Sequence, residues 1–346
     1  MCMQPKLSYL IAVYNGEKYL RQCIDSLYNQ NLPEDDFEVI CVDDCSSDGS
    51  IHILQQYAAQ HPNMHIILHS KNMRTSNSGN EGLQVAKGKY MMFIGQDDWL
   101  EEGCGGKLVR MVDEEQLDIL PFNYNRVNAD GTKILSTVEV FKNSRILDGE
   151  KFVKTYFYDT IGIYLLGYEW RAIYRRQYLL DNDIVFPKDM LFEDTTYLFK
   201  AIWKAKRIQS ISDYIYNYRL NNKSVTNFAQ RYKGYLTYEF SFKTSEEILL
   251  LADVINDEHI AEQLRKTALQ SLKSFGYKII PMSGEEKSIF YDNLQSERDK
   301  VQYLCDLLPW NYRLMLHPKI GKWVVMMLKP IFYINHIFIK RNYANR

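Results

Sequence analysis

The stretch that decides the fold runs from Gly88 to Leu100 and reads GKYMMFIGQDDWL. Its apolar run, Tyr90 to Ile94, is bounded by glycines, which favours a strand buried on both faces of a parallel sheet. Two adjacent carboxylates, Asp97 and Asp98, follow directly. Ligands bind at the carboxyl ends of strands in open α/β sheets, and neighbouring carboxylates repel each other unless a cation offsets their charge. The stretch therefore suggests a Mg²⁺ or Mn²⁺ site that holds a nucleotide diphosphate, although a solvated acidic turn explains the pair equally well by itself.

Composition points to an ordinary globular protein. The chain has 346 residues, of which 46% are apolar and 25% charged, enough for one large domain or two modest ones. Its six cysteines are scattered, without a CxxC pair or a Cys/His cluster at zinc spacing. A reducing compartment is therefore expected. The first residues do not read as a secretion signal, so the expected location is the cytoplasm.

Strands and helices alternate before the central strand. The segments Leu7 to Val13, Phe37 to Val42 and His65 to Leu68 are apolar runs, and each is followed by a segment that suits a helix. This alternation predicts an α/β fold with a doubly wound, mainly parallel sheet.

The pattern changes after Asp98. A strand is expected over residues 117–122, and a hairpin over 127–134, where Asp-Gly forms the turn. The segment 168–180, YEWRAIYRRQYLL, reads as a helix, and another helix is expected to begin at Glu193 or Asp194.

Three pairs of acidic residues stand at predicted strand ends or helix starts: Asp43 with Asp44, Asp97 with Asp98, and Glu193 with Asp194. Strand ends of a parallel sheet converge on one edge, so these pairs are expected to meet in one cleft. There, Asp43 or Asp44 can accept a hydrogen bond from a base or ribose, and Asp194 can abstract a proton. The alternatives are a capping turn for the first pair, and for Asp194 a helix-dipole interaction of about 1 kcal/mol.

Four motifs in this order and spacing resemble those of family 2 glycosyltransferases of GT-A fold. They are AVYNGEKYLRQCIDSLYNQ from Ala12, FEVICVDDCSSDGS from Phe37, NSGNEGLQVAKGKYMMFIGQDDWL from Asn77 and FEDTTYLFKA from Phe192. The resemblance covers roughly residues 6–227, and four motifs together are far more specific than one.

The resemblance implies an inverting transfer of a sugar from a nucleotide-diphosphate sugar, expected to be a UDP-sugar, to a hydroxyl group. The acceptor would be a glycan or a lipid-linked molecule in cell-surface polysaccharide synthesis. Asp194 would be the general base, within a pair with Glu193, and Asp97 and Asp98 would be the metal ligands, with Asp97 matching the last Asp of the family's DxD motif. The nucleotide-sugar site would be formed by Ala12, Tyr14, Asn15, Glu17, Asp43, Asp44, Arg74, Asn80, Gln96, Asp97, Asp98 and Trp99.

Two positions depart from the family pattern. The family usually has Asp where this chain has Gly95, and often Arg where it has Gly79. Arg74 is near enough in sequence to replace the missing cation. Because of these departures, a non-catalytic GT-A module that binds a nucleotide sugar or a partner is the alternative function. Trp99 is expected either to stack on a sugar or to anchor the core, and Arg219 to contact the diphosphate.

A GT-A domain is expected over residues 1–228 and a helical region over 229–346. Seven Lys or Arg and no acidic residue follow Leu307. Apolar residues recur there at helical spacing around Pro330, without an uninterrupted stretch near the ~20 residues that span a bilayer. This basic amphipathic tail suits a peripheral contact with the membrane surface and, equally, packing on the protein. The acidic body makes nucleic-acid binding unexpected.

Overall fold

The computed structural model describes residues 4–157, 168–188, 194–221, 239–279, 282–317, 321, 324–325 and 327. The chain forms two compact units, residues 1–222 and 223–346, which are described one at a time. The predicted boundary after residue 228 lies outside the described residues and stays a prediction.

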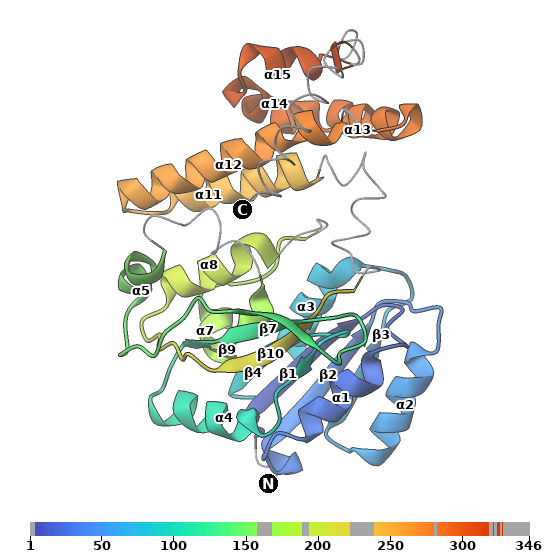
Figure 1. The fold of residues 1–346 in the computed structure, drawn as a ribbon, viewed down its shortest axis with the longest axis vertical. Helices are drawn as coiled ribbons and strands as arrows, with labels where there is room; N and C mark the ends of the chain where they lie inside the picture. Colours follow the sequence, from blue (N-terminus) through green and yellow to red (C-terminus); the bar gives the residue numbers. More distant parts are fainter. Residues whose placement is uncertain are drawn as a thin grey trace. The chain divides into compact units, whose positions relative to one another are not determined.

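The first unit is built on a six-stranded sheet with the order β3-β2-β1-β4-β9-β6 (Figure 1). Its four parallel strands confirm the predicted apolar runs. They are β1 (Leu7–Val13), β2 (Phe37–Asp43), β3 (Met64–Leu68) and β4 (Tyr90–Gly95). All residues of β2 are buried, as expected for a strand covered on both faces.

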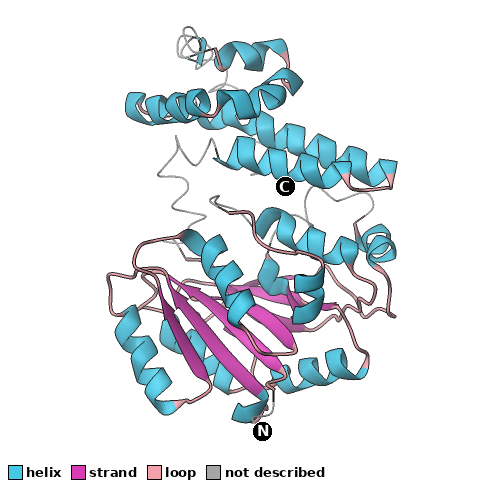
Figure 2. Ribbon diagram, turned by 180° about the vertical axis from the view of Figure 1, so that it is seen from behind, coloured by secondary structure: helices cyan, strands magenta, loops and turns pink. Residues whose placement is uncertain are grey.

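Helices cover both faces of this sheet, which confirms the doubly wound α/β fold. Helices α1 (Leu20–Tyr28) and α2 (Ser50–Gln60) lie on the face seen in Figure 1. Helix α3 (Arg74–Val85) lies on the opposite face, which Figure 2 shows from behind. Helix α4 (Cys104–Glu114) comes later in the chain and packs near the edge of the sheet opposite β3.

The helix predicted over residues 168–180 was wrong for most of its length. A 3-10 turn, η2 (Glu169–Arg171), leads into strand β9 (Ala172–Arg175), and only α7 (Arg176–Asp181) is helical. Strand β9 pairs antiparallel with β4 and with the short strand β6 (Ile119–Pro121). Backbone hydrogen bonds to two strands distant in sequence outweigh the local helical spacing of its side chains.

A second sheet has the order β5-β10-β7-β8. Strands β7 (Asn123–Val127) and β8 (Ile134–Val138) form the predicted hairpin, which turns through Gly131 at φ +78°. Strand β10 (Tyr214–Arg219) lies between β7 and β5 (Trp99–Leu100). Two further helices of the unit are α5 (Gly149–Tyr156) and α8 (Asp194–Lys204).

The second unit is helical in its described part. A π-helical turn, η3 (Glu239–Lys243), precedes α11 (Thr244–Asp253), α12 (Glu258–Ile279), α13 (Gly284–Ser296), α14 (Arg298–Leu307) and α15 (Trp310–Met315). A buried cluster that includes Phe242, Phe275 and Phe290 forms its core.

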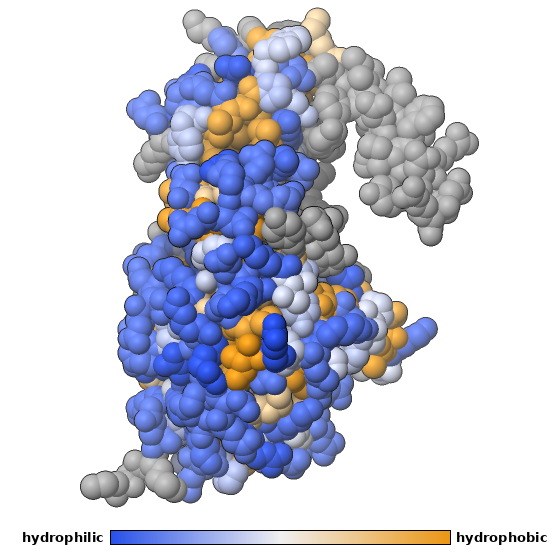
Figure 3. Space-filling view, turned by 90° about the vertical axis from the view of Figure 1, so that its left-hand side faces the viewer, coloured by the Kyte–Doolittle hydropathy of each residue, from blue (hydrophilic) through white to orange (hydrophobic). Residues whose placement is uncertain are grey.

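Some apolar side chains of the second unit stay exposed, among them Leu250, Val254 and Trp310, and orange patches interrupt the polar surface in the space-filling view (Figure 3). None of the helices in the described part of the chain is long and apolar enough to cross a membrane. Most of the predicted amphipathic tail lies beyond the described residues, so its membrane contact stays a prediction.

Candidate active site

The loops that carry the predicted site residues leave the same edge of the first sheet. Val13 is in register with Asp43, and Ala12 with Gly95, so β1, β2 and β4 end side by side. Strands β1, β2 and β3 lie next to one another in that order, and β4 lies on the other side of β1. Such a reversal of strand order opens a crevice at the carboxyl ends of the strands, where ligands bind in open α/β folds.

Gln96 joins the loop after β4 to the loop after β1. Its side-chain amide accepts a hydrogen bond from the Tyr14 N–H at 2.9 Å and donates one to the Tyr14 carbonyl oxygen at 3.0 Å. A Cβ atom on Gly16 would lie 2.3 Å from Gln96 Oε1, so only glycine allows this approach. The amide therefore fixes the backbone of Tyr14, whose side chain is 48% exposed and available for stacking on a ligand.

Asn15 and Glu17 connect the loop after β1 with the loop after β2. Asn15 Oδ1 accepts the Ser47 N–H at 2.8 Å, and Glu17 Oε2 accepts the Gly49 N–H at 3.0 Å. Asn15 adopts φ +50°, a left-handed conformation that Asn tolerates better than most residues. Both side chains thus shape the edge of the crevice through protein contacts.

Asp43 and Asp44 have different environments. Asp43 is fully buried; its Oδ2 accepts the Ser46 N–H at 3.0 Å, while its Oδ1 has no hydrogen-bond partner in the part of the chain that the structure describes. Asp44 accepts the N–H groups of Met73 at 2.6 Å and Arg74 at 2.8 Å, at the start of α3. Asp44 therefore stabilises a helix terminus, whereas Asp43 keeps an oxygen that a bound ligand can satisfy.

His69, which was not predicted as a site residue, lies between the carboxylates of Asp44 and Glu81. Its Nδ1 is 2.7 Å from Asp44 Oδ1 and its Nε2 is 2.7 Å from Glu81 Oε2, while its side chain is only 6% exposed. An ionised carboxylate only accepts hydrogen bonds, so both bonds form together only when the imidazole is protonated. Burial alone lowers the pKa of His69, but the hydrogen bonds and charges of Asp44 and Glu81 raise it above the usual value.

This raised pKa gives a pH dependence of stability. The ion pairs of His69 contribute fully below the pKa of the unfolded chain, about 6.5, and the contribution is lost as pH rises through the higher folded pKa. We expect His69→Gln to destabilise the protein more at pH 6 than at pH 9. Urea denaturation at both values measures this, with the exposed His52→Gln as control. A loss of stability that does not change with pH would contradict the ion-pair role.

Arg74 and Asn80 lie on α3. Arg74 begins the helix at φ +72°, a strained conformation for a residue with a long side chain, and such strain is often found at ligand sites. The Asn80 amide bonds both the N–H and the carbonyl oxygen of Phe186 at 2.9 Å, so it fixes a neighbouring segment.

Asp98 is held by strand β10. Its Oδ1 accepts the Arg219 N–H and its Oδ2 accepts the Tyr216 hydroxyl, both at 2.8 Å, and the residue is 3% exposed. The Tyr216 hydroxyl also accepts the Gly95 N–H at 2.8 Å. Both carboxylate oxygens of Asp98 are thus used to fix the loop that carries Asp97.

Arg219 is enclosed in the same network and is only 2% exposed. Its Nε donates to the carbonyl oxygen of Asp97 at 2.7 Å, and its guanidinium also bonds Ala129 and Gln22. The guanidinium carbon lies 4.6 Å from the Trp99 ring centre and 4.5 Å from that of Tyr19. Trp99 thus contacts Arg219 in this structure, and the guanidinium that was expected to meet a diphosphate is bonded to protein groups.

Asp97 fits a divalent cation. Within the described residues, its carboxylate accepts a side-chain hydrogen bond from Asn221 Nδ2 at 3.4 Å, which leaves acceptor capacity for a metal. Burial raises the pKa of Asp97, against the hydrogen bond from Asn221 and the charge of Arg219, and burial with the charge of Asp97 raises the pKa of Asp98 further. A cation would favour the ionised carboxylates. The described residues contain no group of three His, Cys, Asp or Glu side chains that could hold a metal alone, so diphosphate oxygens would complete the coordination.

The predicted base, Asp194, is the first residue of α8, and Glu193 lies outside the described residues. Asp194 interacts electrostatically with Tyr168: burial raises the pKa of that tyrosine, and the charges of Tyr124 and Asp194 raise it further. Tyr168 stacks on Trp170 at 4.8 Å, and Trp170 stacks on Tyr216 at 4.2 Å. A row of packed aromatic rings therefore connects the start of α8 with the Asp98 network.

The two departures from the family pattern have a steric reason. A Cβ atom on Gly95 would lie 2.6 Å from Asp98 Oδ2 and 3.2 Å from the Tyr216 hydroxyl. A Cβ atom on Gly79 would lie 2.7 Å from the Phe186 ring. Glycine therefore matches the packing at both positions. Tyr216 was not predicted as a site residue; in the sequence it stands within the aromatic run YIYNYR, which indicates a strand and not a hydrogen bond to Asp98.

The doubly wound sheet, with its crevice at the ends of β1, β2 and β4, has the GT-A fold, as in the similar crystal structure of S. aureus TarS 1–349. Residues 8–168, a little under half of the chain, match the sequence model of "Glycosyl transferase family 2", and this match supports a family 2 glycosyltransferase of GT-A fold.

Three similar proteins illustrate the relationship. A poly(ribitol-phosphate) beta-glucosyltransferase of Bacillus spizizenii is 31% identical over 220 residues, which are 62% of this chain and 32% of the relative. The crystal structure of S. aureus TarS 1–349 with UDP-GlcNAc has a TM-score of 0.66 at 23% identity, over 96% of this chain and 91% of that one. A mannosyltransferase of Pyrobaculum calidifontis, solved with GDP-Man and Mn²⁺, has a TM-score of 0.52 at 14% identity, over 94% and 87%. The match thus spans about a third of the first relative, and the two structures support the fold.

Proposed function

We propose that this protein transfers a sugar from a nucleotide-diphosphate sugar, with UDP as the preferred nucleotide, to a hydroxyl group of a cell-surface glycan or a lipid-linked acceptor. The observation that carries the proposal is the unpartnered Oδ1 of fully buried Asp43, at the end of β2. A carboxylate oxygen there accepts a hydrogen bond from a base N–H, which uracil supplies. The UDP-GlcNAc complex of TarS and the names of the curated relatives support the same class of donor and acceptor.

Each loop around the crevice has a role in this proposal. The exposed ring of Tyr14 would stack on the base, held in place by Gln96. Asp97 would hold Mg²⁺ or Mn²⁺, and that ion would neutralise the charge that develops on the leaving diphosphate. Asp98 and Arg219 would keep the Asp97 loop in its conformation. Asp44, Arg74, Asn80 and Glu17 would shape the wall of the site through their protein contacts.

The chemical step would invert the anomeric centre. Asp194 would take the proton of the acceptor hydroxyl as its oxygen bonds the anomeric carbon, and the bond from that carbon to the diphosphate oxygen would break. An ordinary Asp titrates near ~3.9 and is ionised at neutral pH, as a base must be. The protein would work in the cytoplasm, with a peripheral membrane contact bringing it to lipid-linked acceptors.

A thermal-shift screen with UDP, GDP and CDP, each with and without Mn²⁺, tests the donor, because a ligand of the native state raises the melting temperature. We expect the largest shift with UDP and Mn²⁺. Asp43→Asn should weaken UDP binding roughly tenfold, since the charged acceptor for the base is lost. The exposed Asp35→Asn serves as control and should bind UDP as the native chain does.

The alternative, a non-catalytic nucleotide-sugar-binding or partner-binding module, gives a different set of results. Such a module would show a thermal shift with a nucleotide sugar but would release no nucleoside diphosphate with any acceptor. If no nucleotide shifts the melting temperature in either metal condition, the proposed donor site fails as well.

A further inference from the structure

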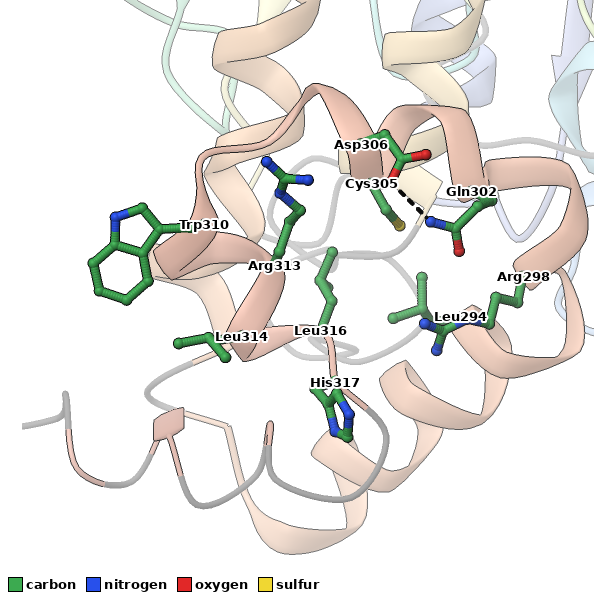
Figure 4. A pocket seen from close by; sticks show the side chains of 10 residues that line it. All are labelled: Leu294, Arg298, Gln302, Cys305, Asp306, Trp310, Arg313, Leu314, Leu316 and His317. Carbon is green, nitrogen blue, oxygen red and sulfur yellow. Dashed lines mark hydrogen bonds between the residues drawn. The ribbon is translucent and has the colours of Figure 1, made fainter.

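A pocket of about 370 Å³ lies within the second unit, between α13, α14 and α15 (Figure 4). Leu294, Leu314 and Leu316 form apolar parts of its wall. Trp310, which is 71% exposed, stands at its margin. A volume of this size, an apolar lining and a few charged groups are the features of small-molecule sites in proteins.

The charges around the pocket are unbalanced. Arg298 and Arg313 both line it, and in the described part of the chain neither guanidinium has a hydrogen bond or an ion pair. The one acidic side chain of the lining, Asp306, instead accepts a hydrogen bond from Gln302 Nε2 at 3.0 Å, drawn as a dashed line in Figure 4. Two cations are thus left beside an apolar surface, where an anion would be favoured.

We propose that this pocket binds an amphipathic phosphate, that is, a phosphate group attached to an alkyl or isoprenoid chain. The phosphate would lie at Arg298 and Arg313, because a guanidinium presents paired N–H donors that match phosphate oxygens. The chain would pack against the leucine side chains and Trp310, which removes apolar surface from water. A free anion would leave the apolar wall exposed, and an apolar chain alone would leave both guanidinium groups unpaired. The inference does not depend on the proposed nucleotide-sugar site.

The probe is octyl phosphate, below its critical micelle concentration, titrated into the full chain by calorimetry. Octanol and inorganic phosphate, titrated separately, represent its two halves. We expect octyl phosphate to bind at least roughly tenfold more tightly than either half, because only it satisfies both parts of the pocket. If octanol binds as tightly as octyl phosphate, the site is an apolar cavity. If inorganic phosphate binds as tightly as octyl phosphate, the site recognises the anion alone. Either result, or no binding of octyl phosphate, overturns the proposal.

Substitutions of the two pocket arginines test where octyl phosphate binds. Arg298→Gln and Arg313→Gln should each weaken octyl phosphate roughly fivefold or more, since each removes a charged donor. Arg265→Gln removes a partly exposed cation of α12 that lies outside the pocket and pairs with Glu258, and this variant should bind octyl phosphate as the native chain does. Unchanged binding in both pocket variants would overturn the proposal.

A further variant distinguishes a loss of binding from a loss of folding. Leu314→Trp adds bulk to a partly exposed wall of the pocket and leaves both arginines in place. It should keep its melting temperature and lose octyl phosphate binding, whereas native affinity in this variant would place the ligand elsewhere and overturn the proposal.

Discussion

Asp97→Asn is expected to lower the metal-dependent release of nucleoside diphosphate roughly 100-fold or more, because it removes the charged ligand of the cation that stabilises the leaving group. The substitution should change the charge at the site without changing the conformation of the loop. The Asp97 side chain accepts a long hydrogen bond from Asn221 among the described residues, while the loop itself is held by Asp98 and by Arg219 Nε on the Asp97 carbonyl oxygen. An asparagine therefore changes the charge at the site and leaves the loop contacts intact.

The measurement is nucleoside diphosphate release from a UDP-sugar across a Mn²⁺ titration. The melting temperature without nucleotide should match that of the native chain. Asp35→Asn, a carboxylate on the surface turn η1 (Glu34–Asp36), should keep full activity. Full activity of Asp97→Asn at low Mn²⁺ would exclude Asp97 as the metal ligand.

Arg219→Lys is expected to lower the free energy of unfolding by roughly 2–4 kcal/mol, although it conserves the charge. An ammonium group cannot reproduce the planar fork that bonds Asp97, Ala129 and Gln22 together, nor its stacking between Trp99 and Tyr19. The shorter, rounder side chain would also leave part of the enclosed space of this 2% exposed residue unfilled, and the lost contacts and packing together are the source of the loss.

Urea denaturation of the native chain and the variant measures this effect, with Arg110→Lys on the exposed side of α4 as control. The control should change stability by no more than about 0.5 kcal/mol. Because Arg219 also supports the Asp97 loop, the variant should require more Mn²⁺ for half-maximal diphosphate release. A variant as stable as the native chain would show that the guanidinium contacts contribute little.

Much of the fold could be predicted from the local sequence. The apolar runs of β1, β2 and β4 are buried on both faces, and a parallel sheet places their carboxyl ends on one edge whatever the loops contain. This is why the convergence of the Asp43 and Asp97 loops could be predicted. Strand β9 shows the limit, because its pairing with β4 and β6 is invisible in its own helical spacing.

The roles of individual side chains depended on residues far away in sequence. Asp98 and Tyr216 are 118 positions apart, and Asn80 and Phe186 are 106 apart, yet each pair is joined by hydrogen bonds. A buried polar group must find a partner, and only the folded chain shows whether that partner is protein or ligand. By itself the sequence thus determined the four parallel strands β1 to β4 and the acidic edge of the sheet. The tertiary structure decided that Asp98 and Arg219 are bonded within the protein, while Asp43 and Asp97 keep acceptor capacity for a ligand.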